Sequence, residues 1–462
     1  MAQSPGFASK ITILFIACLY LAACGPEKTV QWSADGMQAA VVSGGWLYFC
    51  DAQGRLSDPV ADEVESVAWL PDSSRLVVVS KRELATWDEL VAAAPLGLEE
   101  KKIAAAALVA RDEFYGYEGE QDEFRPSHAT VLTSEQWAAA MLYLKSNADP
   151  GLKAKLGDQW KEFEDLKVEI RLVRVMPVVR DAAENGIAWF ATLEEVKELR
   201  LSPDGGALAV VTRRGEGFGD GRVSSLSVFP AREGGKPALV AEGVAEFPDW
   251  SPDGRDLIYI HCETKDTGGT QLGRISRRTV RNAQGAILES PSQAVDLGVV
   301  IFGDTLRVRC LPDGRILFAA AEGALPSVNS DFSNRLTLFF LDPRQAGSIS
   351  RIIPRSADER LPDRADLFEV SPDGKYAAVP GDKGRISRVT LATGEIVAIV
   401  DKDGTGDLHT IPAWRNSQQL CLIAPAGSGY TSSRRDEVIL WSEGQASIVS
   451  QNWPDKVLEA IK

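Results

Sequence analysis

The sequence predicts an all-β protein built from repeated small sheets, and two observations support this prediction. The tetrapeptide Ser-Pro-Asp-Gly, or a close relative of it, occurs seven times along the 462 residues, and each copy lies between two short apolar stretches. Self-similarity at a spacing of roughly 40 to 60 residues is typical of propellers and other repeat folds. The third residues of the copies are Asp35, Asp72, Asp204, Asp253, Asp313, Asp373 and, in a degenerate last copy, Ser417.

The tetrapeptide has the composition of a type I turn. Its Ser can hydrogen-bond the turn backbone, its Pro sets φ near about −65°, and its Gly ends the turn. We therefore expect a strand to reverse at every copy.

The residues around each turn predict two buried strands. The fourth residue after the aligned position is apolar in every copy, within runs such as 76–79 and 257–260. A strand without polar alternation is usually covered on both faces, as in small sheets stacked around an axis. We interpret the two strands as the inner strands of a β-propeller blade, and seven copies predict seven blades, with six or eight as alternatives. The third residue before the aligned position is also apolar in each copy: Trp32, Trp69, Leu201, Trp250, Cys310, Val370 and Trp414.

These copies resemble the TolB-like propeller repeats, also called WD40-like or PD40 repeats. Their hallmark is an apolar residue, Ser-Pro-Asp-Gly and an apolar strand, which residues 250–254 and 370–374 match best. The sequence departs from this pattern at Ala34, Ser73 and Leu311. The resemblance implies a β-propeller over residues 30–450, less one insertion, followed by a C-terminal extension over 451–462.

The N-terminus predicts a bacterial lipoprotein signal over residues 1–23. Lys10 gives a positive start, an apolar stretch follows, and Leu-Ala-Ala precedes Cys24 as in a lipobox. We expect lipidation at Cys24, a tether over 24–29, and no membrane-spanning helix. Gly25 after the cysteine suggests the periplasmic side of the outer membrane. The alternative is an ordinary secretory signal with a chance cysteine.

The net charge of the chain argues against some classes of binding partner. The net charge is −15, which argues against a nucleic-acid surface and favours solubility. We expect a monomer that belongs to the cell envelope.

Four further cysteines remain after signal cleavage. Cys310 and Cys421 occupy positions that are apolar in every repeat, so the prediction is small buried thiols. The alternative is a disulfide between Cys262 and Cys310, or between Cys50 and Cys421.

Residues 84–166 lose the strand pattern and predict a helical insertion in blade two. Ile103, Ala107 and Ala110 recur at helical spacing, residues 133–136 form a capping box, and a third helix is expected around residues 152–163. Strands are expected again over 168–176 and 187–191.

The insertion leaves the blade in a connection between its second and third strands. Such connections lie at the opposite end of the blade from the Ser-Pro-Asp-Gly turns, and in this sequence they are long and polar. We therefore expect the helices to cap that face, and a partner protein or peptide to bind there. The candidate contact residues are Arg213, Phe218, Lys265, Tyr430, Arg434, Arg435 and Trp137.

Catalytic signatures are absent from the sequence. There is no Gly-x-Ser-x-Gly, phosphate-binding loop or His-Glu-x-x-His, and no cofactor is expected. The weak metal candidates are Asp401, Asp403 and Asp407, which resemble a calcium loop but lack its terminal Glu. The predicted function is a non-catalytic, lipid-anchored binding scaffold. The alternative is a propeller hydrolase or lyase with acidic residues around the central channel.

Overall fold

A computed structural model gives the fold. It describes residues 29–52, 55–94, 98–116, 132–157, 160–178, 187–214, 223–231, 237–245, 247–262, 271–302, 307–321, 336–344, 349–351, 368–380, 386–400, 412–426, 435–442 and 451–452.

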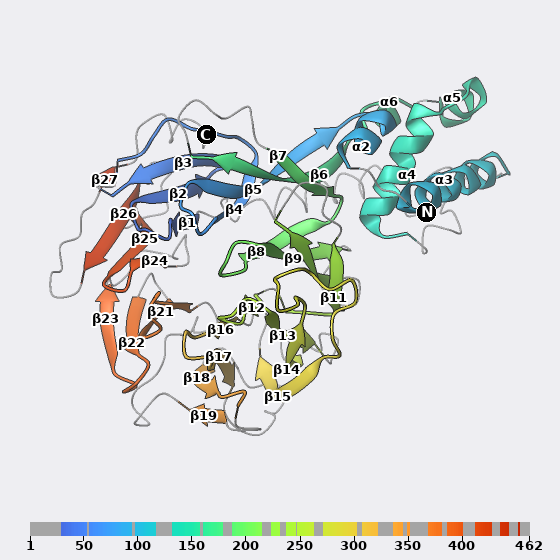
Figure 1. The fold of residues 1–462 in the computed structure, drawn as a ribbon. Helices are drawn as coiled ribbons and strands as arrows, with labels where there is room; N and C mark the ends of the chain where they lie inside the picture. The colour runs from blue at the N-terminus through green and yellow to red at the C-terminus, as the bar shows by residue number, and fades with distance from the viewer. Residues whose placement is uncertain are drawn as a thin grey trace, which may run out of the picture.

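The described residues form seven antiparallel sheets arranged in a ring, which confirms the all-β propeller (Figure 1). Six sheets have four strands and the first has three, and each sheet uses consecutive strands. We call the sheets blades 1 to 7 in chain order. Blade 1 holds β1 (Thr29–Trp32), β2 (Gln38–Ser43) and β3 (Trp46–Asp51); blade 2 holds β4 (Val64–Trp69), β5 (Arg75–Leu84), β6 (Val168–Pro177) and β7 (Ile187–Thr192); blade 3 holds β8 (Glu195–Leu201), β9 (Ala207–Arg214), β10 (Val223–Pro230) and β11 (Ala238–Glu242).

The remaining blades repeat the four-stranded order. Blade 4 holds β12 (Asp249–Trp250), β13 (Asp256–Cys262), β14 (Gln271–Thr279) and β15 (Val295–Phe302); blade 5 holds β16 (Val308–Cys310), β17 (Ile316–Ala321), β18 (Leu336–Leu341) and β19 (Ile349–Arg351). Blade 6 holds β20 (Glu369–Val370), β21 (Tyr376–Pro380), β22 (Ile386–Thr390) and β23 (Ile396–Val400); blade 7 holds β24 (Ala413–Asn416), β25 (Gln419–Ala426), β26 (Arg435–Ser442) and β27 (Gln451–Asn452).

Within the part of the chain that the structure describes, blade 1 has no regular fourth strand, and residues 55–61 take its place along β3. Leu47 N donates to Ala61 O at 2.9 Å, and Ser57 N donates to Phe49 O at 2.8 Å. The outer edge of β3 is therefore bonded, although the segment is too irregular to count as a strand.

The core lies within and between the blades, as the repeat pattern predicts. The residue four places after each aligned position is fully buried in the first six blades: Ala39, Leu76, Leu208, Leu257, Leu317 and Ala377. The equivalent side chain of blade 7, Cys421, lies outside the described side chains.

The repeated turn forms the hydrogen bonds expected of it, and blade 3 shows the full set. Gly205 N donates to Ser202 O at 2.8 Å, closing the turn between β8 and β9. Ser202 Oγ donates to Asp204 Oδ1 at 2.6 Å and accepts from Ala207 N at 3.0 Å. Gly205 has φ +68°, a left-handed conformation that favours glycine. The Ser, the Asp and the Gly of the turn thus each have a role in the local geometry.

The same turns also connect neighbouring blades. A Cβ added to Gly205 would lie 2.8 Å from Cδ of Pro71 in blade 2, and one added to Gly374 would lie 2.7 Å from Cδ of Pro312 in blade 5. The turn glycine of one blade therefore packs on the turn proline of the blade before it. Gly314 in blade 5 is different, because nothing lies within 4 Å of its added Cβ.

A buried arginine reinforces the junction between blades 3 and 4. Arg281 follows β14, and its two terminal nitrogens contact the two Asp204 oxygens at 2.9 and 2.7 Å. Its Nε donates to Gly285 O at 2.8 Å. This ion pair holds the pKa of Asp204 well below its usual range.

The described residues between β5 and β6 form five helices. The two strands pair along their whole length, from Arg75 with Pro177 to Leu84 with Val168. The helices are α2 (Trp87–Ala93), α3 (Leu98–Gly116), α4 (Ser134–Ser146), α5 (Pro150–Leu156) and α6 (Trp160–Glu164). Ile103, Ala107 and Ala110 of α3 are buried, as their spacing predicts. The helices share a hydrophobic cluster with the ends of β5 and β6.

The start of α4 agrees with the sequence prediction, and the region of α5 and α6 differs from it. The capping box at Thr133 is present at the start of α4. The single third helix is wrong: α5 ends at Gly157, which has φ +53°, and α6 begins at Trp160. Gly157 stops the first helix because its left-handed backbone cannot continue the helical path.

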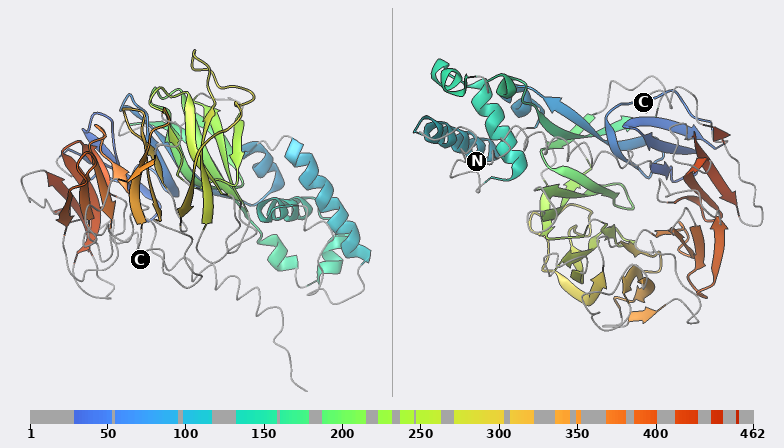
Figure 2. Two further views of the ribbon diagram at one scale, coloured as in Figure 1. Left: turned by 90° about the horizontal axis from the view of Figure 1, so that it is seen from below. Right: turned by 180° about the vertical axis from the view of Figure 1, so that it is seen from behind.

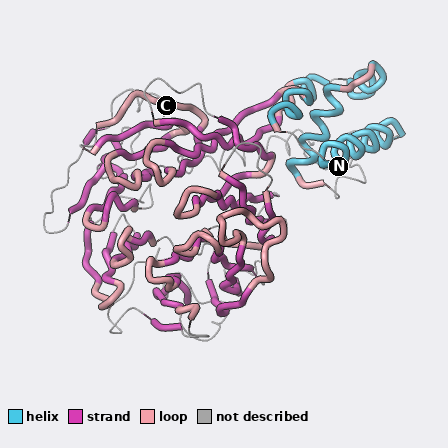
Figure 3. Tube along the Cα trace, in the orientation of Figure 1, coloured by secondary structure: helices cyan, strands magenta, loops and turns pink. Residues whose placement is uncertain are grey.

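The sequence analysis predicts that the helices cap one face of the propeller, and this prediction is wrong. They lie in one group beside the rim of the ring, at the end of the extended β5–β6 pair (Figures 1 and 2). Figure 3 shows that this group holds the helices and that the ring consists of strands and loops in the part that the structure describes. The helices lie beside the rim because β5 and β6 extend away from the ring as a pair before the first helix begins. None of the described helices has the length and apolar character needed to cross a membrane.

The described cysteines are free thiols. Cys50, Cys262 and Cys310 form no disulfide, so both proposed pairings are wrong. Of the two cysteines predicted to be buried thiols, Cys310 is a free thiol that is only partly buried, and the side chain of Cys421 lies outside the described side chains. Cys50 is the fully buried thiol among the described cysteines. Burial raises the pKa of Cys50 to about 12, which keeps the sulfur protonated.

Candidate functional site

The first strands of the blades surround the centre of the ring. Neighbouring first strands are in contact, for example β1 with β4 and β24, and β12 with β8 and β16. The residue four places before each aligned position recurs at the same point of these strands. In chain order these residues are Gln31, Ala68, Arg200, Asp249, Arg309, Glu369 and Ala413.

This set divides the channel into two parts. Blades 3 to 6 contribute charges that alternate in sign, whereas blades 7, 1 and 2 contribute neutral residues. Sequence reasoning missed these residues. The alternation was visible in the aligned repeats, but which charges meet depends on the ring.

The charged residues pair across blade boundaries. Arg200 Nε lies 3.1 Å from Asp249 Oδ1, and Asp249 Oδ2 accepts a hydrogen bond from Cys310 N at 2.9 Å. Arg309 Nη2 lies 3.1 Å from Glu369 Oε2. The lining is therefore held together by contacts between blades 3 and 4, 4 and 5, and 5 and 6.

A second layer of residues lies two positions further back along the chain, on the first strand or directly before it. Arg307 also pairs with Glu369, and its guanidinium stacks 4.5 Å from the ring centre of Phe247. Arg307 Nε is buried and has no hydrogen-bond partner in the described structure. Glu198 belongs to this layer on β8.

The two glutamates in the channel have pKa values that are shifted in opposite directions by their surroundings. Burial raises the pKa of Glu369, but Arg309, Arg307 and Arg200 outweigh it and hold this pKa at about 2. Burial raises the pKa of Glu198 above its ordinary value, and the nearby arginines only partly oppose it. Burial and Arg309 lower the pKa of Arg307 to about 10. Glu369 is thus fixed as an anion, and Glu198 keeps its proton more readily.

Asp249 and Glu369 are both engaged by guanidinium groups, and for Glu369 the arginines outweigh burial and lower its pKa. Among the described residues, no three His, Cys, Asp or Glu side chains lie together as a metal would need.

One end of the channel is surrounded by the Ser-Pro-Asp-Gly turns, and a cavity of about 600 Å³ opens at this end. Turn prolines from blades 2 to 6 line it, together with Trp32, Trp69 and Trp250 from the first strands. Arg200 and Asp249 are its two charged lining residues. The sequence interpretation had placed function at the opposite face, so this cavity was not anticipated.

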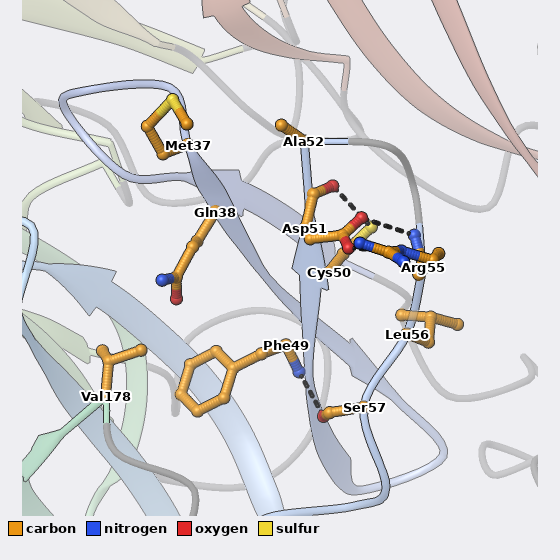
Figure 4. Close-up of a pocket in the computed structure, with 10 residues that line it drawn as sticks. All are labelled: Met37, Gln38, Phe49, Cys50, Asp51, Ala52, Arg55, Leu56, Ser57 and Val178. Carbon is orange, nitrogen blue, oxygen red and sulfur yellow. Dashed lines mark hydrogen bonds and ion pairs between the residues drawn. The ribbon is translucent and has the colours of Figure 1, made fainter.

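A second cavity of about 620 Å³ lies beside β3 of blade 1 (Figure 4). Phe49, Val178 and Met37 supply apolar surface, and Asp51 and Arg55 form an ion pair of 2.7 Å along one side. Arg55 is 73% exposed, so this wall is open to solvent.

The predicted contact residues are placed only in part. Arg213 lies at the end of β9 and pairs with Glu195 at 2.9 Å. Trp137 lies on α4, half-buried against the helical cluster, and Arg435 begins β26. The structure therefore brings none of these three together. Phe218, Lys265, Tyr430, Arg434, the metal candidates Asp401, Asp403 and Asp407, and the lipidation candidate Cys24 lie outside the described residues.

Comparisons with known proteins were made by sequence and by structure. No protein-family model and no curated protein matches the sequence. An oligogalacturonate lyase solved with manganese is similar in structure, with 9% identity, a TM-score of 0.50, and coverage of 93% of this chain and 91% of that one. TolB from Acinetobacter baumannii matches with 13% identity and a TM-score of 0.38 over 60% of each chain.

A third solved structure is the propeller domain of Myceliophteria thermophila Cps50 (Swd1). It matches with 10% identity and a TM-score of 0.46, over 90% of this chain and 97% of that one. This chain spans only 60% of the length of the TolB structure that it matches. At these identities the likeness concerns the fold. The chain is thus a β-propeller, and TolB is among the proteins whose solved structures it resembles.

Proposed function

We propose that the chain is a non-catalytic binding protein of the bacterial cell envelope, anchored by a lipid at Cys24, and that its helices bind a protein or peptide partner. The observation that carries this proposal is the helical group itself. It packs in a hydrophobic cluster that includes the ends of β5 and β6 and stands beside the ring, so it adds surface that the other blades do not need for their own packing.

The outer surface of the helices offers contacts for a partner. Val109 of α3 is 36% exposed and Tyr115 is 38% exposed. Tyr115 Oη donates to Asp149 Oδ1 at 2.6 Å, which ties the end of α3 to the start of α5. An apolar side chain and an oriented tyrosine on fixed helices are typical of protein-binding surfaces.

The ion pairs of the channel support a binding role over a hydrolase or lyase. A carboxylate that acts as a general acid or base must be able to accept or release a proton near the working pH. Asp249 and Glu369 are engaged by arginines, and the pKa of Glu369 is about 2. Burial raises the pKa of Glu198 above its ordinary value.

The register of β5 and β6 allows the helices to be removed cleanly. Lys81 and Arg171 face each other across the two strands. An Asn-Gly turn that joins Lys81 to Arg171 deletes residues 82–170, including the strand ends that pack against the helices, and Leu193→Thr covers the remaining contact. We expect this variant to keep the strand signal of the ring in circular dichroism.

The test is crosslinking in cells followed by mass spectrometry. The deletion and the single change Val109→Glu should both lose the crosslinked partner. Leu239→Glu is the matched control, because Leu239 is 54% exposed on β11 of the ring. If the folded deletion variant still captures the same partner, the helices are not the binding surface.

The anchor requires a separate measurement. The sequence around Cys24 predicts lipidation, so the wild type should incorporate labelled palmitate and fractionate with membranes, and Cys24→Ala should do neither. Membrane association of Cys24→Ala equal to that of the wild type would contradict the anchor.

A further inference from the structure

We propose that the cavity at the turn end of the channel binds a carboxylate with an apolar body, and that Arg200 is its anchor. This inference concerns the ring and does not depend on the helices as a binding surface.

The first step concerns the hydrogen-bonding capacity left at the Arg200–Asp249 pair. Asp249 uses Oδ1 for Arg200 and Oδ2 for Cys310 N, and its side chain is 13% exposed. The Arg200 guanidinium makes one hydrogen bond within the described part of the chain, through Nε, and the side chain is 31% exposed. A guanidinium has five N–H donors and no acceptor. The pair therefore presents unused donors to the cavity, and its complement is an anion.

The second step concerns charge. Arg200, Arg307 and Arg309 face Asp249, Glu369 and Glu198 in the two layers of the channel. Asp249 and Glu369 are each paired with arginine, whereas burial favours the protonated form of Glu198. Among the described residues, the channel thus holds three arginines and two carboxylates that form ion pairs with them. This excess is local, because the whole chain carries −15.

The third step concerns the shape of the ligand. The planar fork of the guanidinium matches the two oxygens of a carboxylate. The walls above it are proline rings and indoles, among them Pro71, Pro203 and Pro252. These surfaces favour an apolar or aromatic group, and about 600 Å³ is within the range of small-ligand sites.

The experiment uses two sources of the same chemistry. One probe is 3-phenylpropionate, and the other is N-acetyl-Ala-Ala-Phe with a free C-terminus. Isothermal titration calorimetry with the full chain should detect binding of at least one of them. The C-terminal amide of the peptide should bind at least tenfold more weakly than the free acid, because hydrogen bonds to charged groups discriminate by roughly ten- to hundredfold.

The variants test the anchor. Arg200→Gln should weaken binding by about tenfold or more, and so should the double change Arg200→Gln with Asp249→Asn, which leaves no unpaired charge if the single variant folds poorly. Arg55→Gln is the matched control, because Arg55 lines the other cavity. Binding of the peptide alone would identify a peptide C-terminus, and binding of phenylpropionate alone would identify a small organic acid.

Three results would overturn the proposal. They are the absence of binding for both probes at 10 mM, equal binding of the acid and its amide, and unchanged affinity in the folded Arg200 variants.

Discussion

Several turn glycines have a contact across the blade boundary as well as a role in their own turn. Gly374 has φ +70° and lies against Pro312 of the preceding blade, whereas Gly314 has φ +86° and faces open space. Both glycines have a left-handed backbone, and only Gly374 contacts a neighbouring blade. A comparison of the same substitution at the two positions therefore distinguishes the cost of backbone strain from the cost of the contact between blades.

We expect Gly374→Ala to destabilise the protein more than Gly314→Ala. Gly314→Ala should cost about 1–2 kcal/mol through the left-handed backbone alone. Gly374→Ala should cost about 1–3 kcal/mol more, because its Cβ would lie 2.7 Å from Pro312 Cδ. Urea denaturation measures both free energies of unfolding, and equal losses would show that the proline contact is easily relaxed.

Glu198 gives a prediction about pH. Its folded pKa lies above the ordinary 4.5, so the folded state holds this proton more tightly than the unfolded chain. The group therefore reduces stability as the pH rises above about 4.5. Glu198→Gln should raise the free energy of unfolding at pH 7.5 and change it less at pH 4, as measured by denaturation at both pH values. A gain that is the same at both would mean that the change acts through packing.

Residues repeated in the sequence were predicted well, and residues that act across blades were not. The Ser, Asp and Gly of the turns have local partners, so their roles follow from the tetrapeptide. Arg281 pairs with Asp204, 77 residues away, and nothing near either residue indicates the other. The Arg200–Asp249 pair was missed for the same reason, since its partners meet only when the blades stand side by side.

The tryptophan before the turn connects the first strands of adjacent blades. Trp69 Nε1 donates to Gln31 O at 2.8 Å, and Trp250 Nε1 donates to Arg200 O at 2.8 Å. Trp414 Nε1 donates to Glu369 O at 3.0 Å. In blade 1 the pattern breaks, because Trp32 Nε1 is buried without a partner in the described structure.

This difference predicts that the same substitution, Trp to Phe, costs different amounts of stability at the two positions. Trp250→Phe should cost about 1–3 kcal/mol, because it removes packing and leaves Arg200 O without its donor. Trp32→Phe should cost less, since it removes an unpaired buried donor. Thermal melts of the two variants test this, and a larger loss for Trp32→Phe would contradict it.

The helical insertion was predicted in existence but not in position. Spacing and the capping box show that residues fold as helices, and they carry no information about the direction in which the group leaves the blade. That direction follows from β5 and β6, which pair out to Leu84 and Val168. The length of a strand pair depends on its partners, so it could not be read from either segment alone.

The ring closes between blades 7 and 1 through side chains. Arg415 Nε donates to Gly36 O at 2.8 Å, and Arg415 Nη1 donates to Ala52 O at 3.1 Å. Its guanidinium also lies 4.9 Å from the ring centre of Trp32. This residue replaces the tryptophan hydrogen bond that is missing at the same junction.

We expect Arg415→Ala to loosen this junction. The global free energy of unfolding should fall by about 2 kcal/mol, since two hydrogen bonds from a charged group are lost. Amide hydrogen exchange should accelerate in β1 and β24 more than in β13. Arg344→Ala is the control, because Arg344 is 65% exposed and its pair with Asp342 is on the surface. Uniform acceleration across all blades would instead indicate a loss of stability without local opening.

The seven-blade count followed from the repeats, and the structure agrees in having six complete sheets and a three-stranded first one. The alignment could count turns, but it could not show that residues 55–61 replace a strand, because irregular pairing leaves no periodic pattern.

Every described sheet uses one uninterrupted run of strands, with none borrowed from the far end of the chain. The blade order is therefore cyclic, and the present break between blades 7 and 1 is only one of seven places where a covalent cut would leave all sheets whole. A circularly permuted gene that opens between blades 3 and 4 would have to rely on Arg281 to hold its new seam, as the natural protein relies on Arg415.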